Sequence, residues 1–307
     1  PPRSTPKPSS AASDVYKRQY LGSALRGAFG RSLRRAVCVL QGGDCQVCPL
    51  QSHCPYVFLF ETPARDFESP FRGMDRAPHP FVLCPPGPAE QLVGTVPLRL
   101  VLIGRSIDYL PHVVWAVHAM SQRGLGAQRR RYRLARLLVQ NEEGGTEVWD
   151  FDGRLLVRAG FRRYRAGQDL SDERASRIRL RFLTPLRIRH QRRLCTHLTF
   201  PILMTNVLRR LYLLDRFHGD GTWEFEHREL IEAAEGVRTV RYNLRWHDWT
   251  RYSSRQDTKM QLGGLIGEVE FEGDLTPFLP YLRVAEEVHV GRNTSFGLGR
   301  MVIDGVG

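Results

Sequence analysis

Apolar residues recur every fourth position near the start of the chain, which is the spacing of one face of a helix. Leu21, Leu25, Phe29 and Leu33 line this face, and arginines fall between them. Farther along, residues 177–182 alternate arginine with apolar side chains, as expected of a strand with one basic face and one apolar face. The chain therefore mixes helices and strands.

The remaining patterns predict a similar order of elements in the two halves. For the first half we expect a helix over 21–33, a Pro-rich loop over 63–97, strands over 97–105 and 134–139, and a helix over 110–120. For the second half we expect strands over 177–189, 237–246, 262–271 and 299–303, and helices over 200–217 and 278–284. The order β-α-β-β-α-β is the ferredoxin-like unit. We predict an α+β fold of two tandem ferredoxin-like (RRM-like) domains, each ending in a glycine-rich loop and a strand, with a Cys-rich insertion in the first.

Three segments follow from this pattern. Residues 1–19 are rich in Pro and Ser and lack periodicity, so they read as a non-native or disordered tail. If the tail is non-native, a native first strand is missing. We expect an N-terminal ferredoxin-like domain with a cysteine cluster over 20–173, and a C-terminal ferredoxin-like RNA-binding domain over 174–307.

The net charge of the chain indicates what kind of partner it binds. The 307 residues carry a formal net charge of +13, and nearly all of the positive charge is arginine, because Lys7, Lys17 and Lys259 are the only lysines. The planar guanidinium suits bidentate contacts with phosphate, so we expect a nucleic-acid partner. Codon usage in a GC-rich genome is the alternative explanation. The sequence shows no apolar run long enough to span a bilayer and no signal-peptide pattern, so we expect a cytoplasmic protein without a membrane partner.

A glycine-punctuated basic loop near the C-terminus is the strongest candidate for binding RNA. Glycine allows positive φ angles and close approach of the backbone to a ligand, and exposed N–H groups with arginines suit an anion. A second Gly-Leu-Gly followed by arginines occurs at 124–133. The residues that we expect to contact RNA are Arg292, Asn293, Thr294, Ser295, Gly297, Gly299, Arg300, Arg255, Gln256, Arg129 and Arg131.

Four of the six cysteines lie close together in the sequence. Their spacing is C-x6-C-x2-C-x5-C, and they are Cys38, Cys45, Cys48 and Cys54. Four thiolates at such spacing indicate a tetrahedral metal site, and we expect structural zinc. An iron–sulfur cluster uses the same ligands and is the competing interpretation, and unlinked thiols or disulfides are a third. Either metal would be structural, with no cofactor needed for catalysis.

Several motifs together resemble a known family. They are residues 20–30 (YLGSALRGAFG), the cysteine cluster at 45–56, 182–187 (FLTPLR), 249–256 (WTRYSSRQ), 263–267 (GGLIG) and 289–299 (HVGRNTSFGLG). Through them the chain resembles the CRISPR precursor-RNA processing endoribonucleases of the RAMP superfamily. That family usually opens with a strand before the first motif, and the tail occupies this place here.

The resemblance implies an endoribonuclease that cleaves CRISPR repeat RNA to mature crRNA without a catalytic metal. The 2′-hydroxyl beside the scissile phosphate attacks it and leaves a 2′,3′-cyclic phosphate and a 5′-hydroxyl. The resemblance also implies CRISPR repeat RNA or crRNA as partner, and CRISPR effector subunits as further candidates. The alternative is a non-catalytic RAMP subunit that binds guide RNA in an effector complex.

The catalytic residues do not carry over directly from the resemblance. Relatives use a histidine near the first helix, whereas no histidine precedes His53 here, which leaves His53 and His79 as positional candidates. His53 lies inside the cysteine cluster and is also a candidate ligand. Two other histidines lie in or beside the matching motifs, next to an arginine and a tyrosine. The residues that we expect to carry the chemistry are His289, His247, Tyr252 and Arg251.

Overall fold

The computed structural model describes most of the chain in ten segments. These are residues 21–41, 43–62, 77–85, 97–125, 131–139, 146–149, 173–221, 227–248, 250–253 and 258–307, with backbone alone at 146–149, 250–253 and 258–261. No helix within these segments has the length and apolar character needed to cross a membrane.

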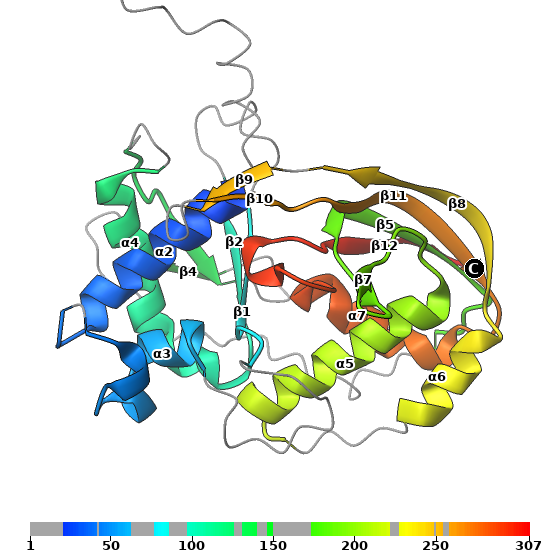
Figure 1. The fold of residues 1–307 in the computed structure, drawn as a ribbon, viewed down its shortest axis with the longest axis horizontal. Coiled ribbons are helices and arrows are strands. Elements are labelled where there is room, and N and C mark those ends of the chain that lie inside the picture. The colour runs from blue at the N-terminus through cyan, green and yellow to red at the C-terminus, as the bar shows by residue number, and fades with distance from the viewer. Residues whose placement is uncertain are drawn as a thin grey trace, which may run out of the picture.

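The C-terminal half contains a four-stranded antiparallel sheet in the order β12-β5-β11-β8. Helix α5 follows β5 and α7 follows β11, and both lie on the same side of the sheet (Figure 1). The β-α-β-β-α-β order predicted for this half is therefore confirmed. The elements are β5 (Arg177–Leu186), α5 (Phe200–His218), α6 (His227–Glu235), β8 (Arg238–His247), β11 (Gly264–Glu272), α7 (Leu279–Val288) and β12 (Met301–Val306).

Alternation along β5 builds the core of this half. Ile178, Leu180 and Phe182 are buried against the helices, while the arginines between them are exposed. Phe200 at the start of α5 meets Phe271 and Phe278 edge to face, with ring centroids 5.1 and 5.0 Å apart. Burial of large aromatic side chains dominates core energetics, so this contact fixes α5 on the sheet.

The N-terminal half is mainly helical. Helices α2 and α4 pack together, and α3 joins them through an aromatic cluster of Phe29, Phe60 and Phe81. Among the described residues the strands of this half form two separate hairpins, β1-β2 and β3-β4. The elements are α2 (Leu21–Val37), η1 (Cys45–Val47), η2 (Gln51–His53), α3 (Pro55–Phe60), β1 (Phe81–Cys84), β2 (Arg99–Leu102), η4 (Gly104–Tyr109), α4 (Leu110–Arg123), β3 (Leu137–Val139) and β4 (Thr146–Trp149).

Some boundaries differ from those expected. The Pro-rich stretch predicted as loop contains β1, because its four apolar residues are fully buried and pair with β2. The strand predicted over 177–189 ends at Leu186, and a short hairpin of β6 (Arg189–His190) and β7 (Arg193–Leu194) follows it. A further hairpin, β9 (Thr250–Ser253) and β10 (Thr258–Gln261), joins β8 to β11.

The two halves meet at the glycine-rich loop before β12. Its short helix η6 (Thr294–Phe296) contacts both β1 and α2, and Figure 1 shows this red segment reaching toward the N-terminal half. The Arg26 guanidinium of α2 lies 4.9 Å from the Phe296 ring centroid. The loop is therefore an internal contact between the halves as well as a surface feature.

Candidate nucleic-acid interface

One end of the C-terminal sheet gathers most of the predicted RNA-binding segments. The last residue of β5, Leu186, pairs with Leu265 near the start of β11, and the last residue of β8, His247, pairs with Gly264. The backbone N–H of Arg292 donates to the Arg187 carbonyl at 2.8 Å, which places the glycine-rich loop at the same end. Segments distant in the sequence thus meet at this sheet end.

An arginine cluster lies at this sheet end. It consists of Arg187, Arg189, Arg292 and, from α5, Arg209. Burial lowers the pKa of Arg187, and the charges of Arg292 and Arg189 lower it further. Burial also lowers the pKa of Arg292, with added repulsion from Arg189 and Arg209. Within the described segments, no ion pair with an acid is formed by Arg187, Arg189 or Arg292.

Arg187 is the most constrained member of the arginine cluster. One of its terminal nitrogens, Nη1, donates to the Gly263 carbonyl, which fixes the side chain against β11. Its Nε is buried and has no hydrogen-bond partner among the described residues. A buried polar atom without a partner is costly, so a guanidinium held in this way favours an anionic ligand.

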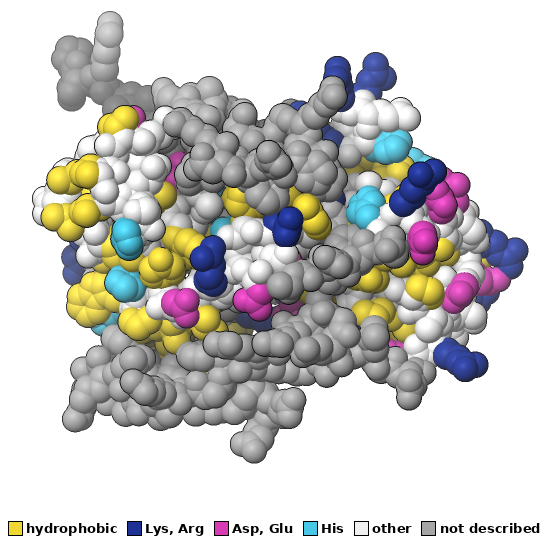
Figure 2. Space-filling view, turned by 90° about the horizontal axis from the view of Figure 1, so that it is seen from below, with side chains coloured by type: hydrophobic (Ala, Val, Ile, Leu, Met, Phe, Trp, Pro, Cys, Tyr) yellow, Lys and Arg dark blue, Asp and Glu magenta, His cyan; other side chains and the backbone are white. Residues whose placement is uncertain are grey.

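The outer face of the sheet is less basic than its sequence predicts. Arg177 pairs with Glu272, Arg179 Nη2 lies 3.5 Å from Glu270, and Arg181 Nη2 lies 2.8 Å from Asp304. These acids offset the charge of β5. On the face seen in Figure 2, basic and acidic side chains are likewise interspersed. The arginine cluster at the sheet end is therefore the stronger candidate for binding phosphate.

The glycines of the loop serve its packing more than its surface. Gly297 and Gly299 are buried with positive φ, and a Cβ at Gly299 would overlap the Val290 carbonyl. Thr294 and Ser295 are also buried. Of the residues predicted here to touch RNA, Arg292 is exposed, and Asn293 and Arg300 are partly exposed. The positive φ expected for these glycines is confirmed, and the packing of the loop accounts for glycine at position 299.

His289 is a packed residue in this structure. Its side chain is 1% exposed, with Nδ1 3.2 Å from the Leu298 carbonyl and Nε2 3.4 Å from Cys84 Sγ. Burial, with the nearby charge of Arg210, lowers its pKa to about 3. An imidazole without solvent access cannot reach a 2′-hydroxyl, so this geometry counts against His289 as the general base.

The other predicted catalytic residues are placed unevenly. His247 is partly exposed at the end of β8, and the neighbouring Gly264 lies against the Arg187 side chain. Beside it, Trp246 is 37% exposed and donates from Nε1 to Asp248 at 2.8 Å. Arg251 and Tyr252 lie on β9, where only the backbone is described.

Three predicted RNA-binding residues lie outside the described residues. They are Arg255, Gln256 and Arg129. Arg131 is described and exposed, in the segment between α4 and β3. Thus the structure places His247 and Arg292 at the same sheet end, Arg300 beside Thr184 of β5, and Arg131 in the N-terminal half.

His79, one of the two positional candidates from the sequence, pairs with Arg26 where α2 meets the glycine-rich loop. Arg26 Nη2 donates to His79 Nε2 at 2.8 Å. Because a guanidinium only donates, Nε2 accepts and the imidazole is neutral with its proton on Nδ1. Phe60 and Phe296 flank the guanidinium, with ring centroids 5.0 and 4.9 Å away. Motif spacing gave no signal for this pair, because 53 residues separate its members.

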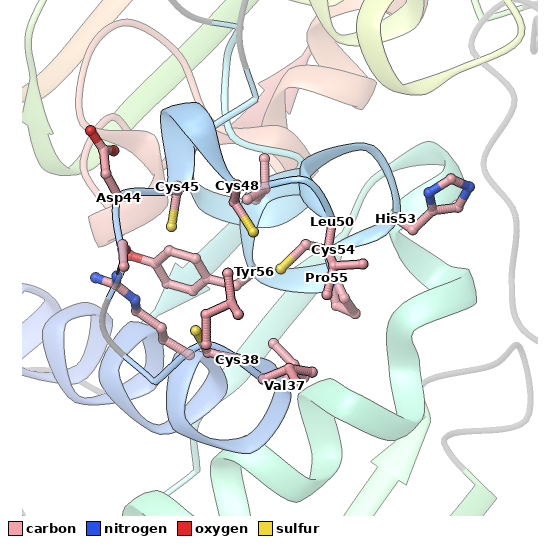
Figure 3. A pocket seen from close by; sticks show the side chains of 15 residues that line it. Val37, Cys38, Asp44, Cys45, Cys48, Leu50, His53, Cys54, Pro55 and Tyr56 are labelled. Carbon is pink, nitrogen blue, oxygen red and sulfur yellow. Dashed lines mark hydrogen bonds between the residues drawn. The ribbon is translucent and has the colours of Figure 1, made fainter.

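The four clustered cysteines line one pocket. In Figure 3 the labelled sulfurs of Cys38, Cys45, Cys48 and Cys54 project into this pocket, whereas His53 points away from it. All four are free thiols of intermediate exposure. Among the described residues, no group of three or more His, Cys, Asp or Glu side chains has the arrangement of a metal-ligand set.

Comparison with known proteins identifies the C-terminal half. Residues 180–301 match the family model of the CRISPR-associated endoribonuclease Cas6. This segment is a Cas6-family domain. The predicted resemblance to CRISPR precursor-RNA processing endoribonucleases is therefore confirmed. A second family model, described as an N-terminal domain, matches residues 10–160. An uncharacterized protein of Archaeoglobus fulgidus is 26% identical over 285 residues, which cover 91% of this chain and 90% of the relative.

Solved Cas6 structures share the fold along most of the chain. Cas6 of Thermus thermophilus has a TM-score of 0.53 at 18% identity, covering 92% of this chain and 90% of its own. The product complex of the same protein has a TM-score of 0.58, covering 92% and 94%. Another Cas6 product complex gives 0.51 at 14% identity, covering 94% of each chain. The chain therefore has the α+β fold of Cas6 across both halves.

Proposed function

We propose that this protein is an endoribonuclease that processes CRISPR repeat RNA. One observation carries the proposal: among the described residues, Arg187, Arg189 and Arg292 of the Cas6-family domain pair with no acid, and the buried Nε of Arg187 has no hydrogen-bond acceptor. Phosphates of a nucleic-acid backbone supply that acceptor and offset the repulsion among the arginines. Trp246 at the same sheet end offers an indole on which an unpaired base stacks.

The proposed chemistry needs no metal ion at the scissile phosphate. A base removes the proton of the 2′-hydroxyl, O2′ bonds to phosphorus, and the bond from phosphorus to O5′ breaks. The leaving oxygen takes a proton and becomes a 5′-hydroxyl, while the other product ends in a 2′,3′-cyclic phosphate. One positioned acid–base group contributes about 10²- to 10⁴-fold to such a step.

We infer that His79 is the base and Arg26 its phosphate-binding partner. The imidazole is neutral and partly exposed, and its Nε2 accepts a hydrogen bond from the guanidinium. A phosphate that takes over the Arg26 contact would release Nε2 toward the 2′-hydroxyl. The guanidinium then stabilises the charge that develops on the phosphorus oxygens. His247, beside Arg187, is the second candidate, with Tyr252 and Arg251 on the adjoining strand as proposed assistants.

Single-turnover cleavage of the repeat RNA from the CRISPR array beside the gene tests this assignment. His79→Ala is expected to slow cleavage about 10²- to 10⁴-fold without weakening RNA binding. His289→Asn is the matched control, because the packed imidazole has no part in the chemistry. Loss of cleavage in His247→Ala but not in His79→Ala would transfer the role to His247. Tight binding without cleavage by the wild type would favour the alternative, a non-catalytic subunit that holds guide RNA.

The tandem ferredoxin-like arrangement also enters here as a proposal. Apart from α3, which is inserted between α2 and β1, the elements α2, β1, β2 and α4 occur in the order α-β-β-α of the middle of a ferredoxin-like unit. The antiparallel pairing of β1 with β2 supports this reading. In this arrangement repeat RNA lies across the junction of the two units, where the glycine-rich loop contacts α2 and β1.

A further inference from the structure

The segment between α2 and α3 lacks the apolar burial that usually holds a folded loop together. Its four large apolar side chains face solvent, with exposed fractions of 76%, 53%, 80% and 47% for Val39, Leu40, Val47 and Leu50. The segment is nevertheless folded into two short 3-10 turns, η1 and η2, which contact each other. Burial of these side chains therefore does little to offset the entropy cost of ordering the segment.

The four cysteines of this segment line one pocket. Cys38 follows the last residue of α2, Cys45 begins the η1 turn, Cys48 follows that turn, and Cys54 precedes α3. Figure 3 shows their sulfurs projecting into the same pocket from opposite walls. Val39, Leu40 and Leu50 also line the rim of this pocket, so the thiols share it with apolar groups that remain largely exposed.

The other polar groups at this pocket are already engaged or turned away. His53 points out of it, with Nδ1 2.8 Å from Ser52 Oγ. Asp44 accepts from the Gln46 N–H at 2.9 Å and so caps the η1 turn. Arg34 donates to the Gly43 carbonyl at 2.6 Å and also hydrogen-bonds the Cys38 thiol, so a cation lies beside the sulfurs.

We propose that Cys38, Cys45, Cys48 and Cys54 bind one structural zinc ion as thiolates. Zinc prefers a tetrahedral set of sulfur ligands, and a C-x2-C turn with two flanking cysteines is a common way to supply it. The four thiols lose their protons on binding, and the net charge of −2 on a Zn²⁺ with four thiolates is partly offset by Arg34. Binding draws the sulfurs together by side-chain rotation, since they already face one pocket.

The zinc site would stabilise the surroundings of the Arg26–His79 pair without contacting that pair. It joins the end of α2 to the start of α3, and α3 presents Tyr56 and Phe60, whose rings stack 5.3 Å apart. Phe60 in turn contacts the Arg26 guanidinium and the His79 ring. Metal binding therefore orders the wall of the Arg26–His79 pair without touching RNA.

Metal analysis of the purified full chain tests the site independently of cleavage. Wild-type protein prepared under reducing conditions is expected to contain about one zinc ion per chain. Cys48→Ser is expected to lose most of that zinc, and Cys195→Ser to keep it. Cys195 is a matched control because its thiol donates to the His197 carbonyl at 2.8 Å in the C-terminal core, where serine also donates.

Reconstitution with Co²⁺ gives a second reading that does not depend on a variant folding. The proposal predicts the intense near-ultraviolet absorption of cobalt–thiolate charge transfer in the wild-type chain, absent after alkylation of the cysteines. Zinc-free wild type, equal zinc in Cys48→Ser and Cys195→Ser, or a cobalt spectrum without thiolate bands would overturn the proposal. Iron with acid-labile sulfide, or disulfides among the four cysteines, would overturn it equally.

Discussion

Replacing Arg292 by glutamine separates RNA binding from folding. Arg292 is exposed as a residue, partial desolvation and the charges of Arg189 and Arg209 lower its pKa, and it pairs with no acid in the described segments. Glutamine keeps most of the side-chain length and the backbone hydrogen bond to Arg187, so only the charge is removed. Arg292→Gln therefore relieves repulsion in the free protein while removing one phosphate contact from the complex.

The magnitude follows from one charge-assisted contact. A hydrogen bond to a charged group contributes about 1.5 kcal/mol at the lower end of its range, which suits an exposed contact. Losing it lowers the affinity about tenfold. Loss of one phosphate contact lowers the slope of log K against log salt by about 0.7 for single-stranded RNA. The free energy of unfolding is expected to stay equal or to rise slightly.

A filter-binding salt titration with repeat RNA measures both quantities, and urea unfolding measures stability. Arg228→Gln is the matched control, because Arg228 on α6 carries the same charge but pairs with Glu232 at 2.9 Å. It should change neither affinity nor salt slope. Equal effects of the two substitutions, or an unchanged salt slope for Arg292→Gln, would refute the assignment of the arginine cluster to phosphate binding.

Three further outcomes are expected. Gly299→Ala should lower the free energy of unfolding in urea by about 2–4 kcal/mol, because the φ of +69° and the Val290 carbonyl exclude a Cβ. Gly305→Ala should leave the free energy of unfolding unchanged, because open space surrounds Gly305. Equal stability of the two variants would contradict the packing described for the loop. Burial lowers the pKa of His289 to about 3 and that of His218 to about 4, so below pH 6.5 only the unfolded chain takes up these protons. The free energy of unfolding should therefore fall with acidification from pH 6.5, by about 1.4 kcal/mol per pH unit for each buried histidine. In His289→Asn the slope of the free energy of unfolding against pH should be smaller by the contribution of one proton. An unchanged slope would show that His289 titrates normally. Arg26→Gln should slow cleavage more than it weakens binding, measured as single-turnover rate against Kd, because its charge acts on the phosphate that reacts; a loss confined to Kd would make Arg26 a binding residue only.

The sequence predicted the C-terminal half well because local pattern and tertiary burial agree there. Alternation over β5 and the four-residue spacing of α5 each bury a single face, so periodicity located both elements. Strand β1 was missed because its four residues are buried on both faces and lie among prolines, which leaves no alternation to detect.

The functional residues were harder to predict, because a sequence motif does not show whether its side chains are buried. His289 lies in the motif with the strongest family resemblance, yet its positive φ turns the side chain under Leu298 and Cys84. The Arg26–His79 pair depends on α2 and the segment before β1 meeting in space, which one sequence does not reveal. Arg187 was visible only as one arginine in a basic strand, and its isolation from acids emerged from the strand pairing.

Analysis of the RNA ends after incubation in EDTA tests the central proposal most directly. Mass spectrometry of the cleaved repeat RNA should show a 2′,3′-cyclic phosphate on one fragment and a 5′-hydroxyl on the other. A 2′-deoxy substitution at the scissile nucleotide should abolish the cut while RNA binding remains. Circular dichroism and zinc analysis in the same buffer confirm that the chain is folded and retains its zinc. Cleavage of the 2′-deoxy substrate, 3′-hydroxyl ends, or intact RNA bound to folded protein would contradict the proposed function.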